Sequence, residues 1–297
     1  MLTLTLQTRG NLMLLLTSFI WGTTFVAQMA GLDGLGPFTY ASARYALGTL
    51  FLYGLWRYTQ AARRKQAVRP GFKAGLGAGV LLFIANSMQQ CAMVYTTAGK
   101  TAFITALYIV LVPLFASLFS IGERVKLVNW LGAVLALVGL YLLSIRGAVT
   151  LNFGDVLVFI SAFVWTAQIL FISYYARDVD AIDLSLTQTA LCLAGSLAAA
   201  FLVEEPAWAP VAAAWLPIAY AGILSTGVAY TLQIVGQKYA PPSDAALIMS
   251  FEAVFGAVSS ALLLGEEMSL PQILGCLLMF AGILVTQLPA LRSAGKK

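Results

Sequence analysis

The sequence contains no histidine and few charged residues. None of its 297 residues is His, and Asp, Glu, Lys and Arg together make up 10% of the chain, against about 25% in ordinary soluble domains. The missing histidine excludes His-ligated metal and haem sites, as well as Ser-His-Asp and Cys-His catalysis. With 60% hydrophobic residues, a chain of this length cannot hide its apolar surface in a soluble fold, so we expect an integral membrane protein.

Cysteine is also scarce, and no nucleotide-binding motif is present. Cys91, Cys192 and Cys276 lie singly in apolar segments and form no Cys-x-x-Cys pair. We interpret them as packing residues and expect no disulfide framework. A Gly-Lys phosphate-binding loop is missing too, so we do not expect direct coupling to ATP.

Long apolar runs fill most of the chain. Each run is continuous and about 20 residues long, the length that a helix needs to cross a bilayer, whereas barrel strands would alternate over about ten residues. We therefore expect an all-α integral membrane protein with ten transmembrane helices, at residues 11–30, 37–58, 71–94, 98–121, 126–146, 154–175, 181–203, 211–238, 242–265 and 270–291.

The positive charges predict the orientation of these helices. If the N-terminus is cytoplasmic, fourteen of the 17 Lys and Arg residues fall on the cytoplasmic side and two on the other, with Arg44 inside the second span. Basic residues concentrate in cytoplasmic segments of membrane proteins. We therefore expect both termini in the cytoplasm, and we assign the net charge of +5 to topology instead of nucleic-acid binding.

The two halves of the chain resemble each other. A shift of 144 residues, which becomes 143 toward the end, superposes identical residue types in one nearly constant register, including Trp21 on Trp165, Gln89 on Gln233, Tyr95 on Tyr239, Gly132 on Gly275 and Gly139 on Gly282. We expect two repeats, at residues 10–146 and 154–291. Each holds five helices, an odd number, so the second repeat must enter the membrane from the opposite side. Such inverted five-helix (5+5) repeats are typical of secondary transporters with a site near the midplane.

A single carboxylate interrupts the apolar stretch SFEAVFGAVSSALLLGEE at residues 250–267. Glu252 lies ten residues into its span, about 15 Å deep, where an unpaired charge is costly. Three interpretations remain open. Glu252 exchanges a proton or binds a substrate amine, it pairs with Arg44 or forms a helix–helix hydrogen bond, or it faces a wet cavity without a specific role. Its counterpart in the first repeat is Tyr108.

Arg44 lies about 10 Å into its own span. It either reaches back to the interface or pairs with a carboxylate, or it recognises a carboxylate or phosphate of the substrate. Its counterpart is Gln188. Lys100 and Asp244 are counterparts near two helix starts. We expect Lys100 to be a solvated interface lysine, with attraction of anions at the outer mouth as the alternative, and Asp244 to cap a positive helix N-terminus.

Polar and aromatic residues inside the spans complete a candidate cavity. Each alone is most often a helix–helix contact, but together they can line an amphipathic pocket. The candidate substrate- or proton-binding residues are Glu252, Trp21, Trp165, Tyr108, Asn86, Gln89, Gln168, Tyr230, Gln233 and Arg44. We expect no catalytic residue, metal or cofactor.

Several segments resemble the EamA-type family of the drug/metabolite transporter superfamily. The first repeat carries FIWGTTFVAQ at 19–28 and LYIVLVPLFASLFSIGERV at 107–125, and the second carries SFEAVFGAVSSALLLGEEMS at 250–269. The resemblance covers residues 10–290 and implies a ten-helix exporter or permease of the bacterial inner membrane. In that family a proline often follows the ninth-helix glutamate. Ala253 stands there in this chain, which predicts a straighter helix.

The expected function is therefore secondary transport of small metabolites, such as amino acids or similar amphipathic compounds, by alternating access across the inner membrane. The alternatives are an uncoupled facilitator or channel-like pore and, less in keeping with the residues, an intramembrane enzyme. We expect a small-molecule substrate, protons as a candidate coupling ion, a surrounding lipid bilayer and no nucleic acid. A monomer is compatible with this interpretation.

Overall fold

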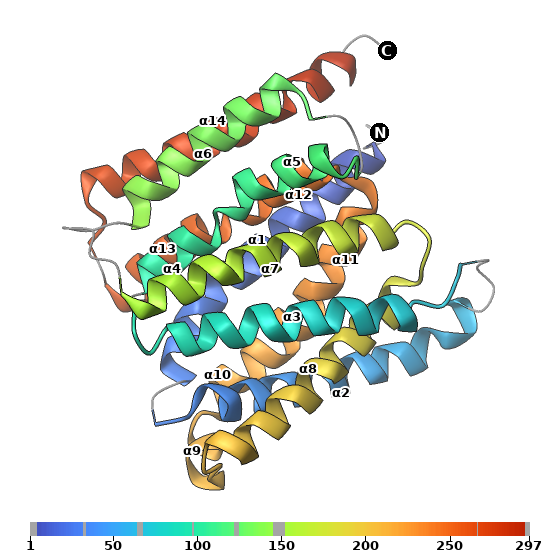
Figure 1. Cartoon of the computed structure of the whole chain (residues 1–297), viewed down its shortest axis with the longest axis vertical. Coiled ribbons are helices and arrows are strands. Elements are labelled where there is room, and N and C mark those ends of the chain that lie inside the picture. The colour runs from blue at the N-terminus through green and yellow to red at the C-terminus, as the bar shows by residue number, and fades with distance from the viewer. Residues whose placement is uncertain are drawn as a thin grey trace.

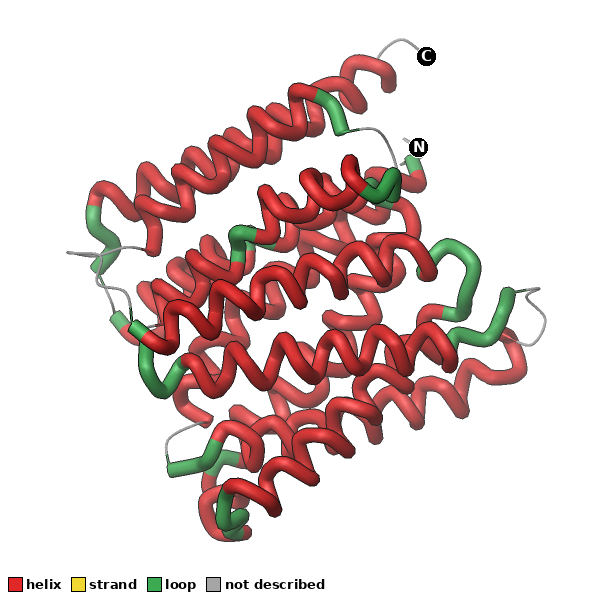
Figure 2. Tube along the Cα trace, in the orientation of Figure 1, coloured by secondary structure: helices red, strands yellow, loops and turns green. Residues whose placement is uncertain are grey.

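The computed structural model describes residues 5–31, 34–63, 68–96, 98–121, 125–144, 152–265 and 267–294. Within these ranges all regular elements are helices, joined by short loops (Figure 2). They are α1 (Leu6–Gly31), α2 (Pro37–Arg63), α3 (Phe72–Ala92), α4 (Ala98–Thr105), α5 (Tyr108–Leu118), α6 (Leu127–Ser144), α7 (Phe153–Tyr175), α8 (Ala181–Val203), α9 (Trp208–Ala213), α10 (Trp215–Tyr220), the π-helix η1 (Ala221–Ala229), α11 (Tyr230–Tyr239), α12 (Pro242–Met249), α13 (Glu252–Leu264) and α14 (Leu270–Ala294).

The helices form one bundle with two ends. The start of α1 and the end of α14 lie at the same end, which we call the terminal face, and α3 ends and α7 begins at the other end, the opposite face (Figure 1). Helix α1 runs through the bundle and packs against α11, α12 and α13 of the second half of the chain. Residues far apart in sequence therefore meet along α1.

The length and hydropathy of the helices agree with a membrane-spanning bundle. Within the described residues, seven segments are long and apolar enough to cross a membrane: Leu6–Gln28, Leu127–Ser144, Phe153–Tyr175, Ala181–Val203, Trp215–Tyr239, Pro242–Leu263 and Leu270–Gln287, with a shorter apolar stretch at Phe103–Leu118. Helices α2 and α3 have 27 and 21 residues, enough for about 40 and 30 Å at 1.5 Å per residue. They are more polar because they carry Arg44, Asn86 and Gln90 in their interiors.

Two of the expected spans are broken at equivalent positions. The 98–121 span divides into α4 and α5 at 106–107, and the 242–265 span divides into α12 and α13 at 250–251. The expected straighter ninth helix is therefore wrong. Backbone bonds of the i→i−3 type, such as Ala253 N–H to the Ser250 carbonyl (3.1 Å) and Ile109 N–H to the Ala106 carbonyl (2.9 Å), tighten the chain at each break. Such a turn requires no proline.

Glycines allow the closest helix contacts, and these contacts repeat. A Cβ atom built on Gly139 of α6 would lie 2.5 Å from the carbonyl oxygen of Gly275 of α14, and one built on Gly132 would lie 2.8 Å from that of Gly282. Exchanging each residue for its counterpart converts the first contact into the second. The seam between α6 and α14 is therefore self-complementary, as an interface across a two-fold axis is.

A second pair of contacts obeys the same exchange. A Cβ atom on Gly10 would meet the carbonyl of Gly236 at 2.8 Å and the Cβ of Tyr239 at 3.0 Å. A Cβ atom on Gly154 would meet the carbonyl of Ala92 at 2.8 Å and the Cβ of Tyr95 at 2.9 Å. The start of α1 thus packs on the end of α11 as the start of α7 packs on the end of α3.

Lys100 and Asp244 lie in polar clusters at the two ends of the bundle. At the opposite face, Lys100 forms an ion pair with the buried Asp155 (3.3 Å), which also accepts a hydrogen bond from Thr96 and belongs to the capping box of α7. Lys100 is therefore the partly exposed member of an ion pair instead of a fully solvated lysine.

At the terminal face, Asp244 accepts hydrogen bonds from the side-chain amides of Gln7 (3.3 Å), Asn129 (3.1 Å) and Gln287 (3.3 Å). Asp244 lies in the first turn of α12, at the positive end of the helix, as expected. Its carboxylate also links α12 to α1, α6 and α14. Only the tertiary structure brings these four helices to one point.

Candidate functional site

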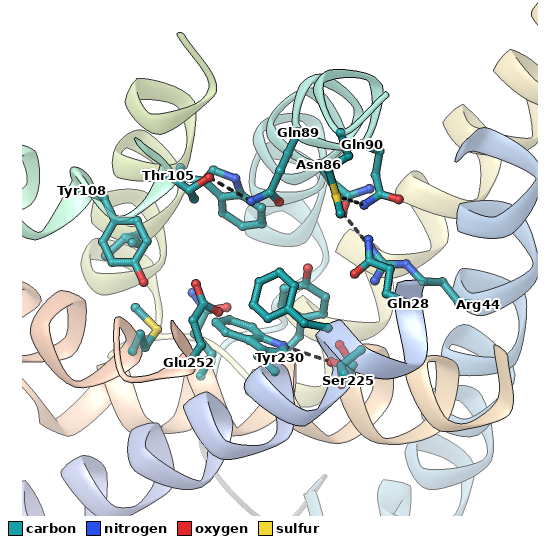
Figure 3. A pocket seen from close by; sticks show the side chains of 18 residues that line it. Gln28, Arg44, Asn86, Gln89, Gln90, Thr105, Tyr108, Ser225, Tyr230 and Glu252 are labelled. Carbon is teal, nitrogen blue, oxygen red and sulfur yellow. Dashed lines mark hydrogen bonds between the residues drawn. The ribbon is translucent and has the colours of Figure 1, made fainter. Parts of the chain in front are cut away.

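A central cavity lies among the helices of both halves of the chain. The space between its atoms, including the part that opens to solvent, is about 700 Å³. Its walls are mainly aromatic, apolar or amide side chains (Figure 3). The lining residues are Trp21, Thr24, Phe25, Gln28, Arg44, Asn86, Gln89, Gln90, Met93, Thr105, Tyr108, Trp165, Ile169, Ser225, Tyr230, Gln233, Met249 and Glu252.

The cavity extends from the middle of the bundle toward the opposite face. Gln28 lies in the last turn of α1 and Met93 directly follows α3, both at that end of the bundle. Toward the terminal face, by contrast, Leu14, Val112 and Leu247 belong to one hydrophobic cluster and are at most 2% exposed. These described residues thus seal the cavity toward the terminal face.

Nine of the ten candidate residues line this cavity, and one does not. Gln168 lies behind the wall, fully buried, and accepts a hydrogen bond from Gln233 Nε2 at 3.3 Å. The other nine come from seven helices of both halves. The structure therefore brings them together, while their roles in transport stay predictions.

Arg44 is a buried wall residue and does not reach the surface. Its side chain is 4% exposed, which excludes the interpretation that it extends back to the interface. Nη2 donates a hydrogen bond to Asn86 Oδ1 at 2.6 Å, and the guanidinium carbon lies 4.9 Å from the centre of the Tyr45 ring. In the described part of the chain no carboxylate forms an ion pair with Arg44, so the alternative in which Arg44 pairs with Glu252 is not observed.

Glu252 is the first residue of α13, directly after the break in its span. The carboxylate is partly buried and points into the cavity, where the Tyr108 hydroxyl faces it (Figure 3). Tyr108 is itself the first residue of α5, after the matching break. The two breaks thus bring counterpart residues of the two repeats to the same point of the cavity.

Aromatic rings form the wall between these two charged residues. The rings of Trp21 and Tyr230 pack edge to face, with centroids 5.2 Å apart. The Trp21 indole N–H donates a hydrogen bond to the backbone carbonyl of Ser225 at 3.4 Å. Ser225 belongs to η1, and π-helical segments shift backbone groups out of their usual register and are frequent at functional sites.

Several residues of the cavity wall are not among the ten predicted from the sequence. Gln90 donates to the Met93 sulfur at 3.7 Å, and Thr105 accepts a hydrogen bond from Gln89 at 2.9 Å. Spacing along α3 offered a signal for Gln90, because it adjoins Gln89 and lies four residues after Asn86. No sequence signal marked Ser225, since its place depends on the π-helix.

The described residues gather no group of three or more Cys, Asp or Glu side chains of the kind that holds a metal ion. What the walls offer is one cation, one carboxylate, several amides and aromatic faces. Such a surface can bind a small amphipathic molecule through charge, hydrogen bonds and stacking.

Comparisons with known proteins agree with this architecture. An uncharacterized transporter of Archaeoglobus fulgidus is 30% identical over 94% of this chain and 86% of its own length. The aromatic amino acid exporter YddG of Escherichia coli is 28% identical over 96% and 98%, respectively. The uncharacterized inner membrane transporter YedA of the same species is 24% identical over 90% and 87%. A solved crystal structure shares the fold with a TM-score of 0.80 at 20% identity, covering 94% of this chain and 98% of its own.

The sequence model of the EamA-like transporter family matches the chain twice, at residues 8–145 and 152–288. Together the two matches include nearly all the described helices. The apolar helices of the chain and its similarity to membrane transporters identify a multi-pass membrane protein. The chain belongs to the EamA-like transporter family.

Proposed function

We propose that the protein is a secondary transporter that moves small amphipathic metabolites across the cytoplasmic membrane by alternating access. The observation that carries this proposal is the position of Glu252, a partly buried carboxylate that faces a central cavity among helices of both repeats. A carboxylate in the middle of a membrane-spanning bundle is costly and is usually retained for a function. Transport, not catalysis, is also the activity named for the relatives.

The proposed architecture has ten transmembrane helices in two inverted five-helix repeats, at residues 10–146 and 154–291. The exchange symmetry of the glycine contacts supports it, as do the breaks at Tyr108 and Glu252. With both termini cytoplasmic, as the positive charges predict, the opposite face is the outer side. The cavity is then open to the outside and sealed toward the cytoplasm. Opening of the apolar layer at Leu14, Val112 and Leu247, with closure of the cavity at the opposite face, would open it inward.

The substrate class that fits the walls is an amino acid with an apolar or aromatic side chain. Trp21, Trp165, Phe25 and Tyr230 supply ring surfaces, and amides and two opposite charges supply polar contacts. The relation to an aromatic amino acid exporter supports the same class. L-Phenylalanine is therefore the first substrate to test.

Within this mechanism we assign Glu252 the coupling role. Glu252 either exchanges a proton with the cavity or binds the cationic group of the substrate. In both cases the carboxylate must bind and release that partner during the transport cycle. The observed geometry leaves that carboxylate without an ion-pair partner among the described residues. Its Tyr108 neighbour provides a hydroxyl without a charge.

The test is transport by the full-length protein in proteoliposomes. Uptake of labelled L-phenylalanine and other amino acids is measured with and without an imposed pH gradient, for the wild type and Glu252→Gln. Glu267→Gln, at an exposed position, is the matched control. We expect a gradient to accelerate uptake in the wild type and the control, and Glu252→Gln to lose that acceleration while it retains exchange.

Two other outcomes have distinct meanings. Equal, gradient-independent transport by the wild type and Glu252→Gln would show an uncoupled facilitator with a structural carboxylate. Flux that does not saturate with substrate concentration, and that shows no counterflow, would indicate a channel-like pore instead of alternating access.

A further inference from the structure

The cavity carries its two charges at separate places. Arg44 is the single basic residue and Glu252 the single acidic residue among the lining residues. Arg44 lies beside Asn86 on one side of the view, Glu252 lies with Tyr108 on the other, and Tyr230 lies between them (Figure 3). The described part of the chain shows no ion pair between the two charges. Each is therefore available to a group that enters the cavity.

The hydrogen bonds of Arg44 are incomplete. A guanidinium has five N–H donors in a planar fork, yet both hydrogen bonds that Arg44 makes to described residues come from Nη2, to Asn86 Oδ1 at 2.6 Å and more weakly to the Tyr45 hydroxyl at 3.5 Å. Nε is buried and has no hydrogen-bond partner. A buried arginine with unused donors and no counter-ion is destabilising in the empty protein. An anionic ligand at the Nη atoms would supply the missing counter-ion.

Asn86 fixes the direction of this group. Its side-chain oxygen accepts from Nη2, so Asn86 holds the guanidinium in one orientation at the cavity wall. The amides of Gln28 and Gln90 line the same cavity (Figure 3). A fixed guanidinium fork is the arrangement that recognises a planar carboxylate through two parallel hydrogen bonds.

We propose that Arg44, oriented by Asn86, is the subsite that binds the carboxylate of the transported substrate. This inference rests on the proposed transport function and narrows its substrate class to carboxylates, zwitterionic amino acids first. A phosphate is a weaker match, because a dianion in this cavity would meet a single cation. The apolar group of the substrate lies against Trp21 and Tyr230, and its ammonium group points toward Glu252.

A purely structural role for Arg44 makes a different prediction. Arg44 links α2 to α3 through Asn86, and its loss in that case would weaken the protein and all ligands alike. A substrate-reading role instead weakens only ligands that carry a carboxylate. The two roles are separated by ligands that differ in one charged group.

The experiment measures binding by titration calorimetry with the full chain in nanodiscs. The ligands are L-phenylalanine, phenethylamine, which lacks the carboxylate, and 3-phenylpropionate, which lacks the amine. The proteins are the wild type, Arg44→Gln, Arg44→Lys and Asn86→Asp. Arg9→Gln removes the same charge from an exposed position and is the matched control.

For Arg44→Gln we expect the affinity for L-phenylalanine and 3-phenylpropionate to fall about tenfold or more, the scale of a lost charged hydrogen bond. Affinity for phenethylamine should change less than about twofold by the same argument, which also shows that the variant is folded. Arg44→Lys keeps the charge but loses the planar fork, so its affinity for L-phenylalanine should lie between those of the wild type and Arg44→Gln. Arg9→Gln should match the wild type.

Asn86→Asp keeps the test decisive if Arg44→Gln does not fold. The new carboxylate would form an ion pair with Arg44, so the variant should lose the binding of L-phenylalanine and retain the binding of phenethylamine. Equal weakening of all three ligands in both variants would overturn the subsite. If the wild type binds none of the three ligands, the proposed substrate class fails and the subsite fails with it. If Arg44→Gln or Asn86→Asp loses only the binding of phenethylamine, the subsite alone is contradicted.

Discussion

The Tyr108 hydroxyl faces the Glu252 carboxylate in the central cavity, and each residue begins the helix that follows a break. The two are counterparts 144 residues apart, so the duplicated chain presents a phenol and an acid at equivalent positions. A phenol can donate a hydrogen bond to an ionised carboxylate and can accept one from a protonated carboxyl group. The pair therefore offers one titratable group with a neutral partner.

This pair predicts non-additive effects on transport. Tyr108→Phe should lower gradient-driven uptake several-fold in the wild-type background but have little further effect in the Glu252→Gln background, because residues in contact couple. Initial uptake rates of the two single variants and the double variant in proteoliposomes measure this. Tyr141→Phe, at an exposed position on α6, should leave the rates unchanged. Additive losses would show that Tyr108 acts independently of Glu252.

The glycine seam between α6 and α14 predicts that a larger side chain at one of its glycines lowers the stability of the protein without a change at the cavity. Gly139→Leu places side-chain atoms where the Gly275 backbone lies, and it should lower the free energy of unfolding by about 1–3 kcal/mol, the usual cost of overpacking. Unfolding in detergent, followed by tryptophan fluorescence, measures the change. A Cβ atom at Gly54 in α2 would meet no heavy atom within 4 Å, so Gly54→Leu should be neutral or slightly stabilising. Equal stability of the two variants would argue against the close contact.

The ion pair at the opposite face predicts unequal effects of its two partners. Asp155→Ala removes one half of the capping box of α7, the bond from Asn152 N–H, together with the bonds to Lys100 and Thr96. It should cost about 2–4 kcal/mol of stability. Lys100→Met should cost about 1 kcal/mol or less, because the lysine is partly exposed and Asp155 keeps its Thr96 and Asn152 partners.

The same unfolding assay distinguishes these two variants. Asp178→Ala removes an exposed carboxylate and should have no effect. A larger loss for Lys100→Met than for Asp155→Ala would show that the lysine, and not the cap, is the main contribution of this cluster.

The open side of the cavity predicts which engineered cysteines react. In a background with the three native cysteines replaced by alanine, Met93→Cys should react in intact cells with a membrane-impermeant thiol reagent, because Met93 lines the cavity at the end of α3, near the opposite face. Arg9→Cys, at the terminal face, should react only after permeabilisation. Substrate in the cavity should slow the reaction of Met93→Cys. The reverse pattern of access would invert the proposed orientation.

Several features of the fold and of the site could be predicted from residues alone. The helical class and the apolar spans follow from local composition. The internal repeat follows from register matches such as Trp21 with Trp165. The interior position of Glu252 follows from counting residues from the start of its span. All of these depend on neighbours along the chain, which is the information that a sequence displays directly.

Other features depend on contacts between distant segments and could not be predicted. Gln168 has the same residue type and a similar depth as Gln233, yet it faces a neighbouring helix instead of the cavity. Ser225 joins the wall because η1 is a π-helix, and Ala253 did not keep its span straight because i→i−3 bonds form at the break. Rotation of a helix about its axis and small changes in its hydrogen-bond register decide such details.

The sequence by itself determined the class of protein, the duplication and the presence of two interior charges, Arg44 and Glu252, because hydropathy and register are properties of the chain. Only the tertiary structure decided that these charges do not pair with each other, that Asn86 orients the first and Tyr108 faces the second, and that Lys100 meets Asp155. The physical reason is that helix packing selects which side of each helix meets which neighbour. Those contacts, not the spacing along the chain, set the chemistry of the cavity.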